Sequence, residues 1–149
     1  MNNQRNDLQI KLLHSVPRAK LSIVLQEGLR ATSSFDDLGL EMRQNVVYCC
    51  LKKEHNKMWE KNPDYAYVEV TVDRSRCRVA DMDFASIAMM YRQGSQGRPK
   101  NSEAARLLAE VYRVTSVSLD EYREGMFWTP EVLVKGNIEP GCIRVLNHI

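Results

Sequence analysis

The sequence lacks the long apolar run of a membrane span. No stretch of its 149 residues approaches the roughly 20 apolar residues that cross a bilayer, and its polar first residues precede no signal-type apolar segment. An apolar fraction of 44% and a charged fraction of 27% are typical of a globular protein. The length suits one domain with a hydrophobic core. We therefore expect a single cytoplasmic domain, residues 1–149, with no membrane partner.

Cysteine spacings typical of metal sites and disulfides are also missing. The four cysteines are Cys49, Cys50, Cys77 and Cys142, and no Cys-x-x-Cys pair occurs among them. Cys49 and Cys50 are adjacent, and adjacent residues of a strand point to opposite faces, which disfavours a bond between them. The sequence thus predicts reduced, mostly buried thiols and no metal site.

The common catalytic motifs are absent as well. The chain contains no Gly-x-x-x-x-Gly-Lys, no Gly-x-Gly-x-x-Gly, no His-Glu-x-x-His and no Gly-x-Ser-x-Gly. The net charge of +2 is too small to argue for or against a nucleic-acid partner. A functional site has to be sought in single residues that the fold brings together.

Apolar periodicity predicts short strands interleaved with helices. Strands are expected at 8–14, 45–51, 65–73 and 77–80, and two more in the segment 130–145, separated by a turn rich in Gly and Pro. Helices are expected at 18–27 (capped by Gly28), 52–59, 84–91, 103–112 (capped by Ser102) and 118–124 (opened by a Ser118–Glu121 capping box). A surface loop is expected at 29–44 and a mobile loop at 93–100. This order predicts an α+β fold, not a doubly wound parallel sheet.

Three residues have the chemistry to form a site. Pro130 places Glu131 at the entry of a strand, where a rigid backbone could aim a catalytic carboxylate, although a solvated surface charge fits the same pattern. His14 lies at the inner end of the first strand and could equally be a structural, hydrogen-bonded histidine. Tyr48 lies in the second strand. Together these groups could bind a ribose, stack on a flat ring and stabilise a developing sugar cation.

Three blocks of this sequence resemble the ADP-ribosyltransferase superfamily. They are the strand with His14 and the helix ending at Gly28-Leu29, the strand 45–52, and the segment from Glu131 to Ile143. The nearest pattern is that of DNA-modifying ADP-ribosyltransferase toxins of the DarT type. The blocks cover about 50 residues and follow the family's order. The resemblance implies an ADP-ribosyltransferase-like split β-sheet core with flanking helices, and NAD in the cleft between two sheets.

The resemblance also implies roles for individual residues. His14 would bind the nicotinamide-side ribose, with Ser15 beside it, and Tyr48 would shape the pocket. Glu131 would be catalytic: it would position the ribose and stabilise the oxocarbenium-like state as nicotinamide leaves.

The cationic positions fit the resemblance less well. The DarT-type pattern has an arginine just after the second strand, where this chain has Lys52 and Lys53. A lysine supplies charge without the bidentate fork of arginine. Lys52 remains a candidate contact to the cofactor, and Arg30 is a substitute candidate for a phosphate contact, although a solvated loop charge is as good an interpretation.

The functional expectation is an NAD-dependent ADP-ribosyltransferase that modifies a macromolecular acceptor, with nucleic acid favoured over protein. Cations in the loops 30–43 and 92–100 would suit phosphates or simply solubility. A toxin of this kind often has a neutralising, antitoxin-type partner. Two alternatives stay open: an RNA 2′-phosphotransferase-like enzyme on the same fold, and a catalytically silent module that binds NAD or nucleic acid.

Overall fold

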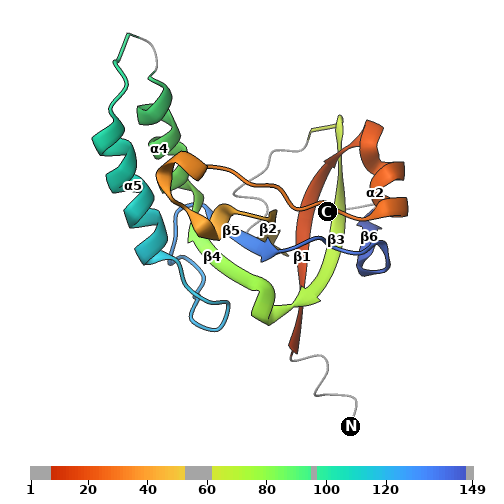
Figure 1. Cartoon of the computed structure of the whole chain (residues 1–149). Helices are drawn as coiled ribbons and strands as arrows, with labels where there is room; N and C mark the ends of the chain where they lie inside the picture. The colour runs from red at the N-terminus through yellow and green to blue at the C-terminus, as the bar shows by residue number, and fades with distance from the viewer. Residues whose placement is uncertain (1–7, 53–61, 95–96, 147–149) are drawn as a thin grey trace.

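One six-stranded antiparallel sheet with three α-helices forms the fold in the described part of the chain (Figure 1). The computed structural model describes residues 8–52, 62–94 and 97–146. The strands are β1 (Gln9–Pro17), β2 (Val46–Leu51), β3 (Tyr65–Asp73), β4 (Cys77–Asp81), β5 (Pro130–Lys135) and β6 (Ile143–Leu146). The helices are α2 (Leu21–Glu27), α4 (Met82–Gln93) and α5 (Ser102–Thr115). The expected α+β class is confirmed.

The sheet consists of two three-stranded halves that share a short junction. Its strand order is β4-β5-β2-β1-β3-β6. β1 pairs with β3 along its whole length, from Gln9 to Pro17, but β1 pairs with β2 only at Leu12–Leu51 and Leu13–Cys50. We call this junction of β1 and β2 the seam. Because it is so short, the halves β4-β5-β2 and β1-β3-β6 are free to diverge on either side of it.

Alternating apolar residues place the core on one face of the sheet. In β3, the valines 68, 70 and 72 are buried, as the alternation predicted, and the predicted bounds of this strand are confirmed. They pack with Leu12 and Val16 of β1 and with Val132 and Val134 of β5. The opposite face of the half β4-β5-β2 is covered by α4 and α5, which lie side by side at one end of the sheet, while α2 lies at the other (Figure 1).

β5 differs from the half-buried strand that its sequence suggested. Every residue from Pro130 to Val134 is buried, because β5 lies between β4 and β2 and has the core on one face and α5 on the other. Glu131 is therefore not a solvated entry residue. The last strand, β6, is not a neighbour of β5; it pairs with β3 at the far edge.

The helix ends are partly as expected. The helical segment after Pro17 begins as a 3₁₀ turn, Arg18–Lys20, and continues as α2 to Gly28, whose φ of 86° confirms it as the C-cap. Leu25 is exposed, although its helical spacing from Leu21 would favour the same buried face. The cap of α5 is also one residue earlier than expected: the side chain of Asn101, not Ser102, accepts a hydrogen bond from the Ala104 amide.

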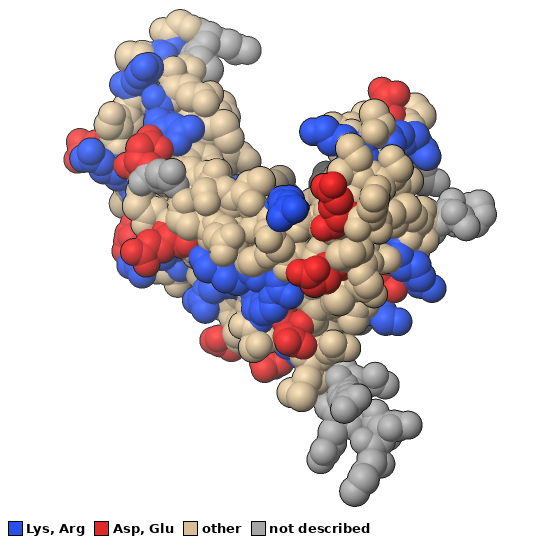
Figure 2. Space-filling model, turned by 45° about the vertical axis from the view of Figure 1, so that its right-hand side comes forward, with Lys and Arg blue, Asp and Glu red and all other residues tan. Residues whose placement is uncertain are grey.

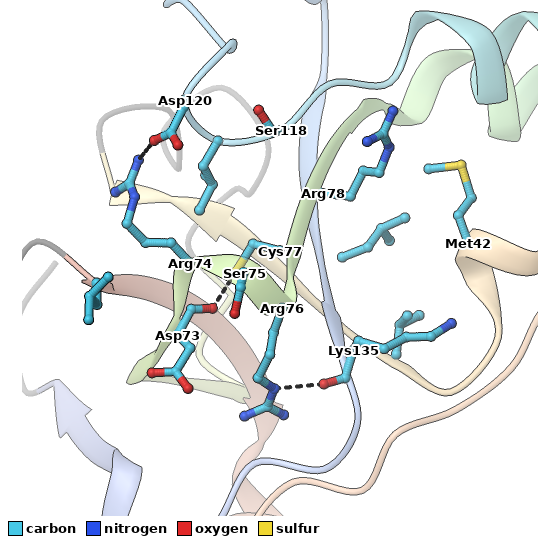
Figure 3. A pocket seen from close by; sticks show the side chains of 14 residues that line it. Met42, Asp73, Arg74, Ser75, Arg76, Cys77, Arg78, Ser118, Asp120 and Lys135 are labelled. Atoms are coloured by element: carbon cyan, nitrogen blue, oxygen red, sulfur yellow. Dashed lines mark hydrogen bonds and ion pairs between the residues drawn. The ribbon is translucent and has the colours of Figure 1, made fainter.

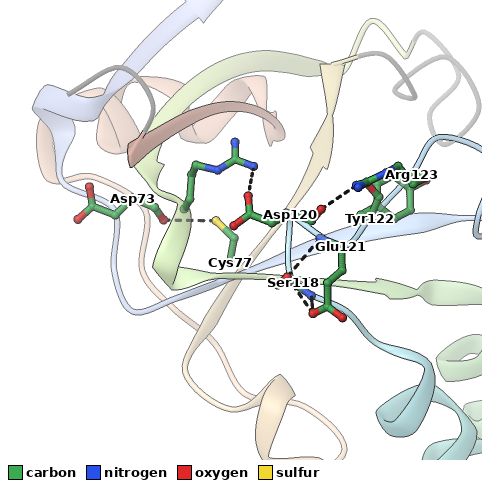
Figure 4. A network of polar contacts seen from close by, with 8 residues as sticks. Asp73, Cys77, Ser118, Asp120, Glu121, Tyr122 and Arg123 are labelled. Atoms are coloured by element: carbon green, nitrogen blue, oxygen red, sulfur yellow. Dashed lines mark hydrogen bonds and ion pairs between the residues drawn. The ribbon is translucent and has the colours of Figure 1, made fainter. Parts of the chain in front are cut away.

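The expected helix at 118–124 does not form. The capping-box bonds are present: the Ser118 hydroxyl donates to Glu121 Oε1 (2.9 Å), and the Glu121 amide donates to Ser118 Oγ (3.3 Å). They close only a turn (Figure 4), and the chain continues irregularly to Gly125, whose φ is 83°. A capping box satisfies the first amides of a turn but does not supply the apolar face that would extend it.

The segment 29–44 is not the surface loop that was expected. It adds bridges to the sheet, Leu29 with Ile138 and Thr32 with Val46, and contains the 3₁₀ turns Asp36–Leu38 and Glu41–Arg43. The side chains of Phe35, Leu40 and Arg43 are buried, the first two in the cluster under α4 and α5. The conformation of this segment is therefore set by tertiary contacts, since its sequence has no apolar periodicity.

Other expectations can be compared briefly. None of the four cysteines forms a disulfide, and only Cys142 is exposed. The expected helix 52–59 lies outside the described residues except for Lys52, as do two residues of the loop 93–100. No helix in the described segments has the length and apolar character to cross a membrane.

Candidate active site around Glu131

Glu131 is a buried carboxylate at the second position of β5. It lies opposite Ala80 of β4, and its side chain is 3% exposed. The apolar neighbours on this face come from α5 and from Leu133, two residues further along the strand. A carboxylate buried in this way cannot be solvated by water, so its hydrogen bonds have to come from polar groups of the protein.

Two side chains from distant segments meet Glu131. Arg43 Nη1 forms an ion pair and hydrogen bond with Glu131 Oε1. The Tyr112 hydroxyl of α5 donates to the same oxygen at 2.5 Å, and Arg43 Nη1 also donates to the Tyr112 oxygen at 3.0 Å. The three groups form a closed triangle in which the charge of Glu131 is matched by one cation and one hydroxyl donor.

Burial shifts the protonation equilibria of this triangle. It raises the pKa of Glu131 above its ordinary value, although the charge of Arg43 and the bonds from Tyr112 and Arg43 oppose the shift. Burial, followed by the negative charge of Glu131, raises the pKa of Tyr112. Tyr112 therefore stays a hydroxyl donor at neutral pH, and Glu131 holds a proton more readily than a solvated glutamate does.

Arg43 is fixed on all sides. Its guanidinium carbon lies 4.7 Å from the ring centre of Tyr48, 5.1 Å from that of Phe35 and 5.4 Å from that of Tyr112. Its Nε donates to Ser34 Oγ at 3.1 Å. Three aromatic faces and three hydrogen-bond acceptors leave this cation little freedom, so it holds Glu131 in a defined orientation.

A chain of contacts extends from this cluster to His14 across the seam. Ser34 Oγ and the Tyr48 hydroxyl are 2.7 Å apart, and His14 Nδ1 donates to the backbone oxygen of Tyr48 at 2.5 Å. Burial lowers the pKa of His14, and its bond to Tyr48 only partly opposes this. A neutral ring whose Nδ1 donates has its lone pair on Nε2, so His14 offers a hydrogen-bond acceptor at that atom.

The structure thus connects three of the residues singled out in the sequence. His14 and Glu131 do not touch; they are joined through Tyr48, Ser34 and Arg43. Because Val132 pairs with Cys49 of β2, Glu131 lies two strands from β1, about 10 Å across the sheet.

The remaining predicted residues lie apart from this cluster. Lys52 forms an ion pair with Glu69 of β3, a buried carboxylate that also lies 3.1 Å from Arg144. Ser15 pairs with Tyr67 in the β1–β3 ladder, and Arg30 is exposed after the bridge at Leu29. Lys53 lies outside the described residues.

Sequence reasoning missed Arg43, Tyr112 and Ser34. Tyr112 had a detectable signal, since it continues the apolar stripe of α5, which is buried at Ala105 and Ala109, and thereby aims a hydroxyl at the sheet. Arg43 and Ser34 had none, because the segment that contains them has no period and their partners are remote in sequence. The described residues contain no group of three or more His, Cys, Asp or Glu side chains that could hold a metal ion.

Comparison of the whole chain with protein-family models, with curated proteins and with solved structures gives no match.

Proposed function

We propose that this protein is an NAD-dependent ADP-ribosyltransferase whose catalytic residue is Glu131. The observation that supports this most directly is the contact chain from buried Glu131, through Arg43, Ser34 and Tyr48, to His14 on the other side of the seam. A second support is that the single six-stranded sheet narrows to two paired positions between β1 and β2. NAD would lie at the seam, and its co-substrate would be a macromolecular acceptor.

Glu131 would act on the nicotinamide-side ribose. The bond from ribose C1′ to the nicotinamide nitrogen breaks, and its electron pair leaves with nicotinamide, which becomes neutral. The positive charge that develops on the ribose is stabilised by the Glu131 carboxylate in a site from which water is largely excluded. The acceptor's nucleophile then bonds to C1′ and gives its proton to the carboxylate, whose raised pKa suits that task.

His14 would position the ribose. Its Nδ1 is occupied by the Tyr48 carbonyl, so Nε2 is the atom that can accept a bond from a ribose hydroxyl. Ser15, half-buried beside it, offers a second hydroxyl. Tyr48 would support this role twice, because its backbone orients His14 while its ring packs on Arg43.

The phosphate contacts are less well supported. Lys52 is engaged by Glu69, which reduces its value as a cofactor contact, whereas Arg30 is exposed. In the loop proposed for the acceptor, Arg92 is bound to Asp37 (2.7 Å) and stacked on Phe35 (4.8 Å), while Arg98 and Lys100 are exposed. Nucleic acid is the favoured acceptor because of the resemblance alone. A toxin role with an antitoxin-type partner likewise rests on the resemblance alone.

The test is release of nicotinamide from NAD by wild-type protein and by the variant Glu131→Gln. Glutamine keeps the shape of the side chain but removes the negative charge, so turnover should fall by about 100-fold or more. Glu139→Gln is the matched control, since Glu139 is an exposed glutamate after the same strand, and its turnover should be unchanged. The melting temperature shows whether each variant is folded, and calorimetry shows whether it binds NAD.

Retained turnover in a folded Glu131→Gln variant would overturn the catalytic role. Binding of NAD without turnover in either form would favour the silent module, which one observation supports: Arg43 already neutralises the carboxylate. The RNA 2′-phosphotransferase alternative needs several arginines around the site, and in the described part of the chain only Arg43 contacts this cluster.

A further inference from the structure

A pocket of about 800 Å³ opens where β3 turns into β4, apart from the site around Glu131 (Figure 3). Four of its lining residues are cationic, Arg74, Arg76, Arg78 and Lys135, and two are acidic, Asp73 and Asp120. None of the residues in the contact chain from His14 to Glu131 lines it. It is therefore a separate site with its own charge, and the proposed reaction makes no use of it.

Two of the arginines are tethered to neutral oxygens. Arg76 donates to the backbone oxygens of Lys135 (2.8 Å) and Asn137 (2.6 Å). Arg78 donates to the hydroxyl (2.8 Å) and the backbone oxygen (2.9 Å) of Ser116. Such bonds hold a guanidinium in place without cancelling its charge, so these cations are already oriented before any ligand arrives.

Lys135 is held in the same manner. Its Nζ donates to the backbone oxygens of Gln44 (2.6 Å) and Glu41 (3.3 Å). Among the described residues, no carboxylate forms an ion pair with Arg76, Arg78 or Lys135, whereas Arg74 forms one with Asp120 at 2.9 Å (Figure 3). The pocket thus contains three cations without an ion-pair partner among the described residues, in a lining that also includes the carboxylates of Asp73 and Asp120. Figure 2 shows Lys and Arg side chains gathered on the lower middle of the face drawn, with Asp and Glu side chains beside them.

Part of the wall is apolar. Met42, Val46, Leu119 and Leu133 line the pocket beside the cations. Fixed cations bind phosphate oxygens by charge-assisted hydrogen bonds, and an apolar wall accepts the flat face of a base. The volume is in the range of pockets that hold a small ligand.

We propose that this pocket binds a nucleotide-type ligand, with phosphate groups on the cations Arg76, Arg78 and Lys135, which lie at different places along the wall (Figure 3), and a base against the apolar residues. The same chemistry is offered by a free nucleotide and by a nucleotide within a strand. The proposal does not depend on the transfer reaction at Glu131, and its test measures binding alone.

The sharpest variant is Ser75→Glu. Ser75 lines the pocket, is exposed and makes no hydrogen bond with another described residue, so the substitution adds a negative charge and removes no tether. Binding of adenosine 5′-monophosphate, of a labelled ten-residue oligothymidylate and of a matching oligouridylate is measured by calorimetry and fluorescence anisotropy. The affinity of the probes that bind should fall by about fivefold or more, through charge repulsion close to the phosphate.

Ser22→Glu is the matched control, because Ser22 is exposed on α2 and the same change in net charge is made away from the pocket. A second pair is Lys135→Gln with Lys20→Gln, in which the first should weaken binding and the second should not.

The probes also distinguish the two sources of the ligand. Equal affinity for monophosphate and oligonucleotide identifies a free nucleotide; tighter oligonucleotide binding that weakens between about 50 and 200 mM salt identifies a strand. The proposal is overturned if no probe binds the wild type, or if Ser75→Glu and Ser22→Glu bind alike.

Discussion

At the scale of single residues, the most consequential arrangement is the buried triangle of Glu131, Arg43 and Tyr112. A buried ion pair contributes little net stability, because desolvation offsets much of the attraction, yet removing one partner costs about 3–5 kcal/mol. Here one oxygen of Glu131 accepts hydrogen bonds from both Arg43 and Tyr112. A group that is costly to bury and closely held by its neighbours is a good candidate for function, since packing alone would be served by an apolar side chain.

His14 gives a prediction at the same scale. Burial lowers its pKa below the ordinary 6.5, so between that value and its folded-state pKa the unfolded chain binds a proton that the folded protein does not. The stability that His14 contributes is therefore complete above about pH 6.5 and is lost as the pH falls through the folded-state pKa.

We accordingly expect the difference in free energy of unfolding between wild type and His14→Gln to shrink as the pH is lowered from about 8 to about 5. Urea unfolding at each pH measures it, and Ser15→Ala, on the same strand, should follow the wild-type pH dependence. A difference that does not change with pH would show that the folded protein does not hold His14 neutral.

Single residues were predicted from the sequence only where local chemistry pointed to them. Glu131, His14 and Tyr48 stand out as polar groups within apolar strands, and the structure connects them. Lys52 was named for its position after β2, but it forms an ion pair with Glu69 of β3, two strands away in the sheet. Arg43 could not be found, since its importance comes from residues up to 88 positions away.

At the scale of elements, Gly28 sets how α2 joins the sheet. Its φ of 86° and ψ of −173° belong to a region that is essentially restricted to glycine. A Cβ at this position would lie 2.3 Å from the backbone oxygen of Ile138, which is itself held by the Leu29 amide at 2.8 Å. The backbone there has no room to adjust.

Gly28→Ala should therefore destabilise the protein by about 3 kcal/mol or more, from backbone strain together with the clash. Gly39→Ala is the matched control: its φ is also positive, at 68°, but no atom lies within 4 Å of the added Cβ. Its cost should be about 1 kcal/mol. Urea unfolding compares the two, and equal losses would mean that the contact with Ile138 is relieved without cost.

Element prediction succeeded where one face decides the pattern. β3 has its core on one side and follows strict alternation, so its bounds were correct. β5 is buried on both faces, so the alternation of apolar and polar residues does not predict which of its side chains are buried. The turn at 118–121 has local capping signals without the apolar stripe of a helix, and a helix was wrongly inferred from the caps alone.

At the scale of the whole molecule, the seam makes the proposed cofactor position testable. If NAD lies between the two halves of the sheet, amide hydrogen exchange in β1 and β2 should slow when NAD is added, while exchange in β6, at the far edge, should not change. Mass spectrometry of peptic peptides gives this map.

The same experiment distinguishes NAD binding at the seam from NAD binding in the cationic pocket. Slower exchange confined to residues 74–78, with β1 and β2 unaffected, would place NAD in the cationic pocket and contradict the position at the seam. Glu131→Gln should show the wild-type pattern, because it is expected to bind NAD without turning it over.

The position of β5 in the middle of its half-sheet also constrains how the chain is made. While the ribosome is still synthesising residues before 130, β1 can already pair with β2 and β3, but β4 has no neighbour to join. Until β5 has emerged, Arg43 has no Glu131 to pair with, and the cluster beneath α4 and α5 lacks Leu133. Long-range pairing forms slowly, so we expect this half of the sheet to form after the pairing of β1 with β3.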